Sequence, residues 1–373
     1  MNSSPSATLC VATPNTAGGR LESLQALRGL AALAVLTAHF KFTAQTYDFQ
    51  RMPAWAASGL GGVGVDLFFV ISGFVISMTA DRKQQSAREF LTARAIRVLP
   101  LYWLLSLPYL LKELLSADRN GRVILNSLFF LPLADVGKFT HPAHPYGWTL
   151  SFEIWFYTLF ALLLLWFAPR RAGGFLPLML GTACGVAASI SLRPEGWYFP
   201  WFALHPLCLE FCAGCVLYRY HERFGRVEAG VAGTLAALLL AVVLPRMPWL
   251  GEAFEFMDRP DWSWQRALVW GGSAVCLVIA ALGWERSSSR VLPRWMLVVG
   301  DASFSLYLIQ PYTLFAIRRL GIDNLLISSG CFLVLTLLAS VAFWRWVELP
   351  LTRVARRWFG GTSHQIRILK AGA

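Results

Sequence analysis

Charged residues are scarce in this sequence: Asp, Glu, Lys and Arg make up 14% of its 373 residues. Hydrophobic residues make up 56%, and they include 16 Trp and 26 Phe. Soluble globular domains carry about 25% charged residues. The composition therefore excludes a single soluble core and indicates a polytopic membrane protein.

The chain also lacks internal repeats with a period of tens of residues, and it lacks a long hydrophilic segment. We therefore expect one membrane domain at 21–350 with short loops and no second catalytic domain. Residues 1–20 lack the apolar core of a signal peptide and are expected to form a disordered cytoplasmic tail. Residues 351–373 are expected to form a basic cytoplasmic tail. Its segment 351–359 combines arginine with aromatic residues, which is typical of a helix lying on an anionic membrane surface.

Apolar stretches of about 20 residues predict about ten transmembrane helices in an all-α bundle. Lys and Arg number 33 against 21 acidic residues, and most of them fall in alternate connections between the predicted spans. The positive-inside rule then places both termini in the cytoplasm. The net charge of +12 reports this topology and does not indicate nucleic-acid binding, because the basic residues flank the spans. The predicted spans lie near 25–46, 60–80, 98–116, 148–168, 174–192, 200–218, 228–245, 267–284, 296–317 and 325–347.

Two connections have features of their own. The outer connection 117–147 contains an apolar piece at 123–132, which is too short to span a membrane and is expected to be an interfacial or re-entrant helix. The inner connection 81–97 is strongly basic and is expected to be a cytoplasmic loop.

Cysteine and histidine offer little support for a metal centre. Cys208, Cys212 and Cys215 have a spacing known from iron–sulfur enzymes, but they share one face of an apolar span. Small side chains there favour close packing between helices. His141 and His144 are each followed by proline, which breaks the helix that would bring both rings together. We expect no metal site, and consider these two histidines as loop residues near a ligand site.

Arg28 and His39 stand eleven positions apart in an otherwise apolar span. The helical rise places the imidazole roughly 16 Å above the guanidinium, about halfway across the hydrocarbon core. Ionisable groups at that depth usually face a bundle interior or a water-filled cavity. This pair predicts a proton-handling site or a substrate pathway.

Other polar residues lie where they could face the same interior. Asp66 follows four glycines in 59–64, and it either orients His39 or forms an ion pair with an arginine of another helix. Glu153 and Tyr157 are four residues apart, so both can face one cavity. Arg94 and Arg97 share a helix face at the cytoplasmic boundary, where arginines either bind phosphate or anchor the span.

Taken in order along the chain, these residues resemble the acyltransferase-3 family of membrane proteins. The resemblance implies an enzyme that moves an acyl group, often acetyl from acetyl-CoA, onto a carbohydrate. It covers residues 20–352, nearly the whole chain. Its motifs are Arg28 with His39, 61–76 around Asp66, 94–103 with both arginines and Tyr102, 148–157, 303–308 and 348–350.

The resemblance also implies a role for each matching residue. His39 is the expected general base, because an imidazole with a pKa near 6.5 can take a proton from a sugar hydroxyl at neutral pH. The remaining expected roles are catalytic for Asp66 and Glu153, acyl-donor binding for Arg28, Arg94, Arg97 and Tyr102, and acceptor binding for Trp148, Ser151, Tyr157, Ser305 and Tyr307. From the residues alone, hydrogen bonding between helices is favoured for Ser303, Ser305 and Tyr307, and Trp148 is equally typical of an aromatic belt at the membrane surface. The co-substrate is expected to be acetyl-CoA or another acyl-CoA, without a metal.

The sequence departs from the family at two positions. Gln310 stands where a histidine is common, and Phe304 stands where a tyrosine is common. Glutamine cannot transfer protons, so His39 is expected to act without a second histidine. Among the other span histidines, His205 lies at a position that the motifs do not mark.

A second function class explains the buried ionisable groups equally well. A proton-coupled transporter or flippase of a lipid-linked sugar would use His39, Asp66 and Glu153 as a proton relay. It predicts two symmetric halves, and hydropathy shows no such symmetry. We therefore expect an O-acyltransferase of the bacterial inner membrane, with a carbohydrate acceptor and membrane lipids as partners, and no nucleic acid.

Overall fold

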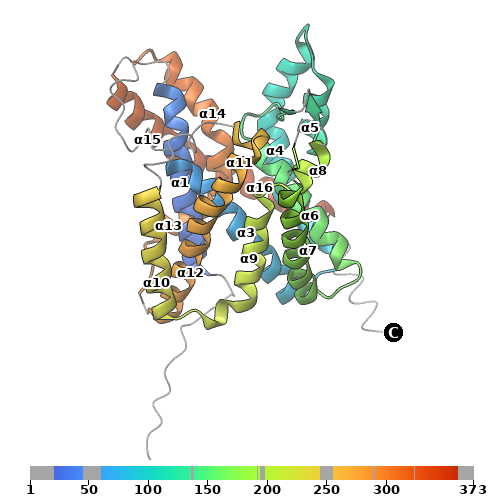
Figure 1. The fold of residues 1–373 in the computed structure, drawn as a ribbon. Helices are drawn as coiled ribbons and strands as arrows, with labels where there is room; N and C mark the ends of the chain where they lie inside the picture. Colours follow the sequence, from blue (N-terminus) through green and yellow to red (C-terminus); the bar gives the residue numbers. More distant parts are fainter. Residues whose placement is uncertain are drawn as a thin grey trace, which may run out of the picture.

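A computed structural model describes residues 21–44, 60–135, 138–190, 192–193, 198–243, 255–288, 290–322 and 324–359. The predicted tail 1–20 and residues 360–373 of the predicted C-terminal tail lie outside these ranges. The described residues are almost entirely helical (Figure 1). The longer helices are α1 (Glu22–Ala44), α3 (Val63–Lys83), α4 (Ala87–Leu115), α6 (Trp148–Leu164), α7 (Pro169–Ser189), α9 (Cys208–Tyr220), α10 (Arg226–Leu238), α12 (Gly272–Ser287), α14 (Ser303–Arg319) and α15 (Leu325–Phe343).

Short elements connect and extend these helices. A two-stranded antiparallel sheet pairs Ala134 with Phe139 and Asp135 with Lys138. The short helical elements are η2 (Leu60–Gly62), α5 (Gly121–Phe129), α8 (Tyr198–Ala203), η3 (His221–Arg223), η4 (Leu239–Val243), η7 (Glu255–Asp258), α11 (Pro260–Arg266), η8 (Ala267–Gly271), α13 (Arg294–Asp301), η9 (Trp344–Glu348) and α16 (Leu349–Phe359), and the strands are β1 (Ala134–Asp135) and β2 (Lys138–Phe139).

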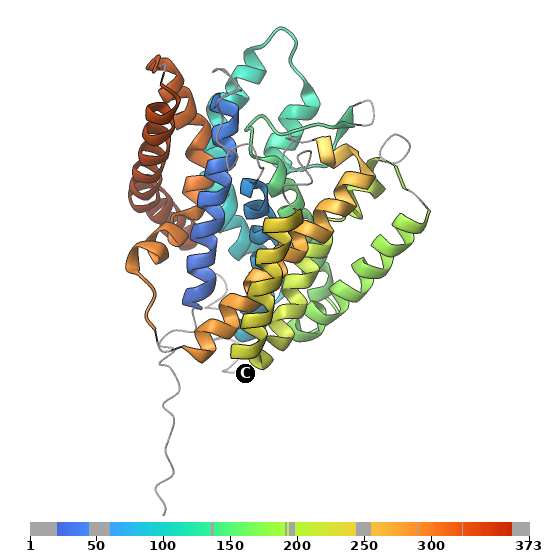
Figure 2. The ribbon, with the colours of Figure 1, turned by 60° about the vertical axis from the view of Figure 1, so that its left-hand side comes forward.

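The long helices run side by side as a bundle (Figure 2). Helix α1 packs against α3, α12, α13 and α14. It therefore presents residues to several neighbours at once, which is the placement that the Arg28 and His39 pair requires.

Within the described ranges, six helical segments are long and apolar enough to cross a membrane, and α6 is a shorter apolar helix. The chain is thus a multi-pass membrane protein with an all-α fold. Each of the ten predicted spans overlaps a helix. The number of ten spans and the cytoplasmic position of both termini remain predictions. The six segments are Val63–Lys83, Ala87–Leu115, Pro169–Ala188, Tyr198–Arg223, Pro260–Ser287 and Leu326–Phe359.

The basic connection 81–97 is mostly helix, so the prediction of a loop was wrong. Helix α4 begins at Ala87 because Ser86 and Glu89 form a capping box. The Glu89 amide donates to Ser86 Oγ at 3.3 Å, and the Ser86 amide donates to Glu89 Oε2 at 2.9 Å. Arg94 and Arg97 are therefore held on a 29-residue helix.

Glycine allows the close approach of α3 to its neighbours. A Cβ at Gly61 would clash with the Ala38 Cβ, so η2, which leads into α3, lies directly against α1. A Cβ at Gly73 of α3 would clash with the Phe211 carbonyl oxygen on α9. The three cysteines of α9 are buried in this packing, and Cys215 Sγ lies 3.5 Å from the Gly73 carbonyl oxygen. Close helix packing, as the sequence predicted for these cysteines, is confirmed.

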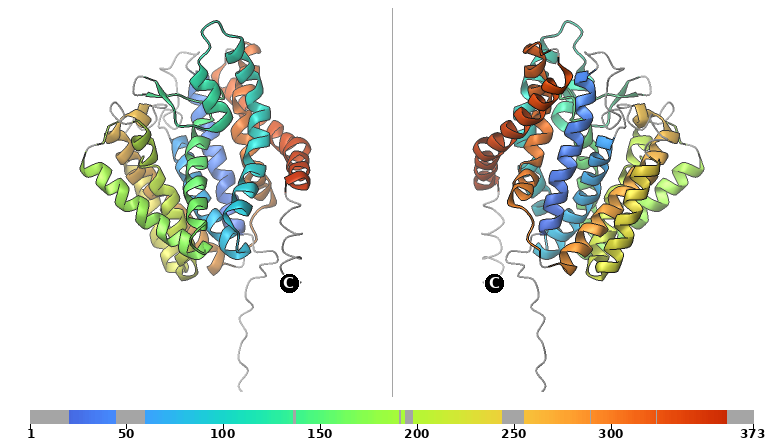
Figure 3. Two further views of the ribbon diagram at one scale, coloured as in Figure 1. Left: turned by 90° about the vertical axis from the view of Figure 1, so that its right-hand side faces the viewer. Right: turned by 90° about the vertical axis from the view of Figure 1, so that its left-hand side faces the viewer.

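The segments 123–132 and 351–359, each predicted to lie at a membrane surface or within it, are both largely helical. Most of the predicted helix 123–132 lies in α5. Helix α5 ends at Phe129, because Phe130 adopts a left-handed conformation. The segment 351–359 belongs to α16, which continues from α15 through the π-helical turn η9. Helix α16 lies on the outside of the bundle (Figure 3). Its position on the membrane surface remains a prediction.

Candidate functional site

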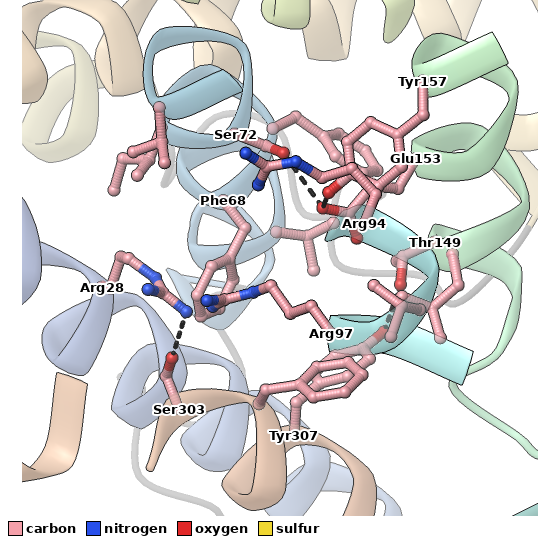
Figure 4. A pocket seen from close by; sticks show the side chains of 17 residues that line it. Arg28, Phe68, Ser72, Arg94, Arg97, Thr149, Glu153, Tyr157, Ser303 and Tyr307 are labelled. Atoms are coloured by element: carbon pink, nitrogen blue, oxygen red, sulfur yellow. Dashed lines mark hydrogen bonds between the residues drawn. The ribbon is translucent and has the colours of Figure 1, made fainter. Parts of the chain in front are cut away.

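A cavity of about 110 Å³ lies where α1, α3, α4, α6 and the start of α14 meet (Figure 4). We call it the inner cavity. It combines a charged lining with apolar side chains such as Phe68 and Val98. Six residues for which the sequence predicted a functional role line it: Arg28, Arg94, Arg97, Glu153, Tyr157 and Tyr307.

Three arginines from two helices reach the inner cavity. Arg28 of α1 is half-buried, and its Nη2 donates to Ser303 Oγ at 2.9 Å. Arg94 of α4 is buried, with its guanidinium carbon 5.8 Å from the centre of the Tyr157 ring. Arg97 is exposed and still lines the cavity, so it lies at an opening. The side chains of Arg28 and Arg97 point into the cavity from opposite helices (Figure 4).

Glu153 supplies the negative charge of the inner cavity. Ser72 Oγ donates to its Oε1 at 3.0 Å, and the Tyr157 hydroxyl donates to the same oxygen. The spacing of Glu153 and Tyr157 predicted that both face one cavity, and this is confirmed. The two donated hydrogen bonds hold the carboxylate in a fixed orientation opposite the arginines.

His39 does not line the inner cavity. Its Nδ1 is hydrogen-bonded to Oε1 of the buried Gln310 side chain. Its ring stacks on Tyr146, with centroids 3.9 Å apart and planes 3° from parallel. Tyr146 in turn contacts the ring of Tyr307, which lines the cavity. A row of three rings therefore connects His39 to the cavity wall.

A hydroxyl network joins the same residues. The Tyr307 hydroxyl donates to the Tyr146 carbonyl oxygen at 3.0 Å and lies 3.0 Å from Thr149 Oγ1. Tyr146, Thr149 and Tyr307 are all buried. The network fixes the segment before α6 against α14. It thereby fixes Tyr146, on whose ring His39 stacks.

Asp66 forms an ion pair with an arginine, which is one of the two interpretations that the sequence left open. Arg266 of α11 donates from Nη2 to Oδ2 at 2.7 Å and from Nε to Oδ1 at 3.1 Å. Both side chains are buried. A bidentate pair of this kind ties α11 to the start of α3.

Four further residues that the sequence singled out lie away from the inner cavity. Tyr102 packs against Phe130, with ring centroids 4.7 Å apart, and not beside the arginines of its own helix. Trp148 is buried against Phe152. Ser151 Oγ donates to Asn126 Oδ1 at 3.3 Å, and Ser305 Oγ donates to the Glu348 carboxylate.

The two loop histidines are held differently. His144 is buried, with Nε2 3.1 Å from the Leu308 carbonyl oxygen and Nδ1 accepting from the Tyr146 amide at 3.2 Å. Burial lowers the pKa of His141 to about 4, so this imidazole is neutral at pH 7. Within the described ranges, no group of three or more His, Cys, Asp or Glu side chains is arranged to hold a metal ion.

Sequence reasoning missed Ser72 and Thr149 as cavity residues and considered Ser303 mainly as an interhelical hydrogen-bonding residue. All three line the inner cavity. Serine and threonine are common in membrane helices, so their presence alone gives no functional signal.

Comparison with known proteins gives a consistent result over most of the chain. The acyltransferase-3 family, described as an acyltransferase domain, matches residues 21–345. The chain is 29% identical over 310 residues to the exopolysaccharide production protein ExoZ of Rhizobium meliloti (strain 1021). The alignment covers 80% of this chain and 91% of that protein. No solved structure matches.

Proposed function

Because the chain belongs to the acyltransferase-3 family of membrane O-acyltransferases, we propose that it transfers an acetyl group from cytoplasmic acetyl-CoA to a hydroxyl of a cell-envelope carbohydrate. The membrane is the bacterial inner membrane in this proposal. The convergence of Arg28, Arg94 and Arg97 on one cavity, opposite Glu153, is the observation that carries it.

The three arginines suit the acyl donor. Guanidinium groups bind phosphates in a bidentate manner, and CoA carries its phosphates at the end remote from the thioester. Arg97 lies at an exposed opening and would meet the phosphates first. The predicted topology places this opening on the cytoplasmic side, where acetyl-CoA is made.

His39 supplies the general base. It takes the proton of the acceptor hydroxyl as the new ester C–O bond forms, and the thioester C–S bond then breaks. The proton returns to the CoA thiolate, so the products are an acetyl ester and free CoA. Gln310 Oε1 accepts a hydrogen bond from Nδ1–H, which leaves Nε2 as the nitrogen that can take the proton.

The acceptor is proposed by analogy with a relative of known name. ExoZ of Rhizobium meliloti is an exopolysaccharide production protein, and by analogy we propose an exopolysaccharide or a related envelope glycan. Tyr157 and Tyr307 line the inner cavity and are proposed to contact the acceptor there. Trp148, Ser151 and Ser305 are proposed only as supports of the segments that carry those tyrosines, because none of the three lines the cavity.

The test uses purified full-length protein in nanodiscs. The proposal expects slow hydrolysis of acetyl-CoA without an acceptor, and loss of acetyl groups from surface glycans when the protein is deleted from cells, measured by mass spectrometry. His39→Ala should abolish glycan acetylation, because a general base contributes about 10²–10⁴-fold to rate. If the protein neither binds nor hydrolyses acetyl-CoA, and the glycans keep their acetyl groups, the proposal fails. Proton-coupled sugar uptake into proteoliposomes without acyl transfer would support the transporter instead.

A further inference from the structure

A second and larger cavity lies at the end of the bundle that the charge distribution predicts to be outside. Its volume is about 450 Å³, within the range of about 300–1,000 Å³ that small-ligand sites occupy. The end of α7, helix α8 and the start of α11 form its walls. Helix α11 lies in the upper part of the view, away from the end where α1 begins (Figures 1 and 2). We call this space the outer cavity.

The outer cavity has the lining of a site for a neutral, hydroxyl-rich ligand. Two indole rings, of Trp201 and Trp264, stand beside two arginines and two aspartates. The four formal charges cancel, so the lining selects neither an anion nor a cation by net charge. Carboxylates accept hydrogen bonds from neighbouring hydroxyls and guanidinium groups donate to oxygen, whereas indole rings cover apolar C–H faces. The charged residues are Arg193, Arg259, Asp258 and Asp261.

Hydrogen bonds hold the walls of the outer cavity in place. Trp201 Nε1 donates to the Met257 carbonyl oxygen at 2.7 Å, so the buried indole is fixed in one orientation. The Phe139 amide donates to Asp258 Oδ1 at 3.3 Å, which ties this carboxylate to strand β2. A site with its polar groups already positioned loses less entropy when a ligand binds.

Helix α11 is anchored from within the bundle. Its Arg266 forms the buried bidentate pair with Asp66, and its Ser263 Oγ lies 3.1 Å from His205 Nε2. Asp261 and Trp264 on the same short helix line the outer cavity. The buried polar cluster therefore positions the wall that the ligand would touch.

We propose that the outer cavity binds a neutral saccharide unit of the acceptor glycan, at a distance from the hydroxyl that receives the acyl group. The inner and outer cavities share no lining residue. The proposal rests on acyl transfer to a carbohydrate as the function of the protein. It adds a second contact that holds the polymer while His39 takes the proton of the acceptor hydroxyl.

The experiment measures binding of cellotetraose and maltotetraose, both neutral, to the full-length protein in nanodiscs by titration calorimetry. Trp264→Ala should weaken binding about tenfold, because an aromatic contact is lost. Trp264→Phe should retain most of it. Trp166→Ala is the matched control, because Trp166 is exposed and lines neither cavity. Acetyl-CoA hydrolysis without an acceptor should be unchanged in all three variants, which also shows that they fold.

Three results would overturn this inference. They are absence of binding of both probes to the native protein, equal weakening by Trp166→Ala, and tighter binding of an oligogalacturonide than of the neutral probes. A phospholipid that copurifies with the native protein and is lost from Trp264→Ala would identify a lipid site instead. Hydrolysis of acetyl-CoA without saccharide binding would contradict only the proposed saccharide site in the outer cavity. Saccharide binding without any acyl transfer would contradict the proposed function and leave the saccharide site supported.

Discussion

His39 and Gln310 are separated by 271 positions in the chain, and their side chains are hydrogen-bonded inside the bundle. One of the two positions at which the sequence departs from its family is therefore in direct contact with the proposed general base. Glutamine cannot shuttle a proton, but its side-chain oxygen can hold the imidazole in one tautomer. We assign Gln310 a positioning role.

This role predicts a graded response at position 310. Gln310→Ala should lower kcat about 10- to 100-fold, as loss of a residue that orients a functional histidine does. Gln310→His should retain most activity, because a neutral imidazole can also accept the Nδ1 hydrogen bond. The measurement is kcat and KM for acetyl-CoA across pH. A purely structural role for Gln310 would lower the amount of active protein and leave the pH profile of the remaining activity unchanged.

The stacking of His39 on Tyr146 leads to a second prediction. Tyr146→Phe keeps the ring and should retain activity, whereas Tyr146→Leu should lower kcat up to about tenfold, since an aromatic pair contributes about 0.5–1.5 kcal/mol. Both variants keep the backbone carbonyl that accepts from Tyr307. Single-turnover acetyl transfer is the measurement. Equal rates for the two variants would show that the ring does not support His39.

Much of the fold could be predicted from the sequence, because apolar length and helical periodicity are local signals. The same holds for pairs on one helix: Glu153 with Tyr157, and Arg94 with Arg97, face one cavity as their spacing indicates. The capping box that starts α4 is also a local signal, because Ser86 and Glu89 have the spacing that marks a helix N-terminus inside the connection predicted as a loop.

Contacts between distant segments could not be predicted in this way. Asp66 and Arg266 are 200 positions apart, and neither charge alone indicates its partner. A carboxylate that orients His39 was one of the two interpretations left open for Asp66, and the structure places a glutamine side chain and a tyrosine ring against the imidazole. Side-chain pairing across a bundle depends on helix rotation and on approach distances, which hydropathy does not encode.

Arg97 offers a direct test of donor binding. Arg97→Ala should raise KM for acetyl-CoA about tenfold to a hundredfold, because hydrogen bonds to charged groups contribute about 1.5–3 kcal/mol. The kcat should change little if the arginine contacts only the phosphates. Arg88→Ala is the control, because Arg88 is an exposed arginine on the same helix that does not line the inner cavity. An equal effect of both variants would indicate a general electrostatic effect of α4 and not a phosphate site.

Variants of the Asp66 and Arg266 pair distinguish the two roles that the sequence left open for Asp66. Asp66→Asn leaves a buried guanidinium without its counter-charge and should lower stability by about 3–5 kcal/mol. Adding Arg266→Gln removes that charge and should restore much of the stability and, with it, the activity. Thermal inactivation in nanodiscs measures the first effect, and acetyl transfer below the inactivation temperature measures the second. If Asp66 instead orients His39 during catalysis, the double variant will regain stability while kcat stays as low as in Asp66→Asn. If stability and kcat both recover in the double variant, the role of the pair is to hold α11 against α3.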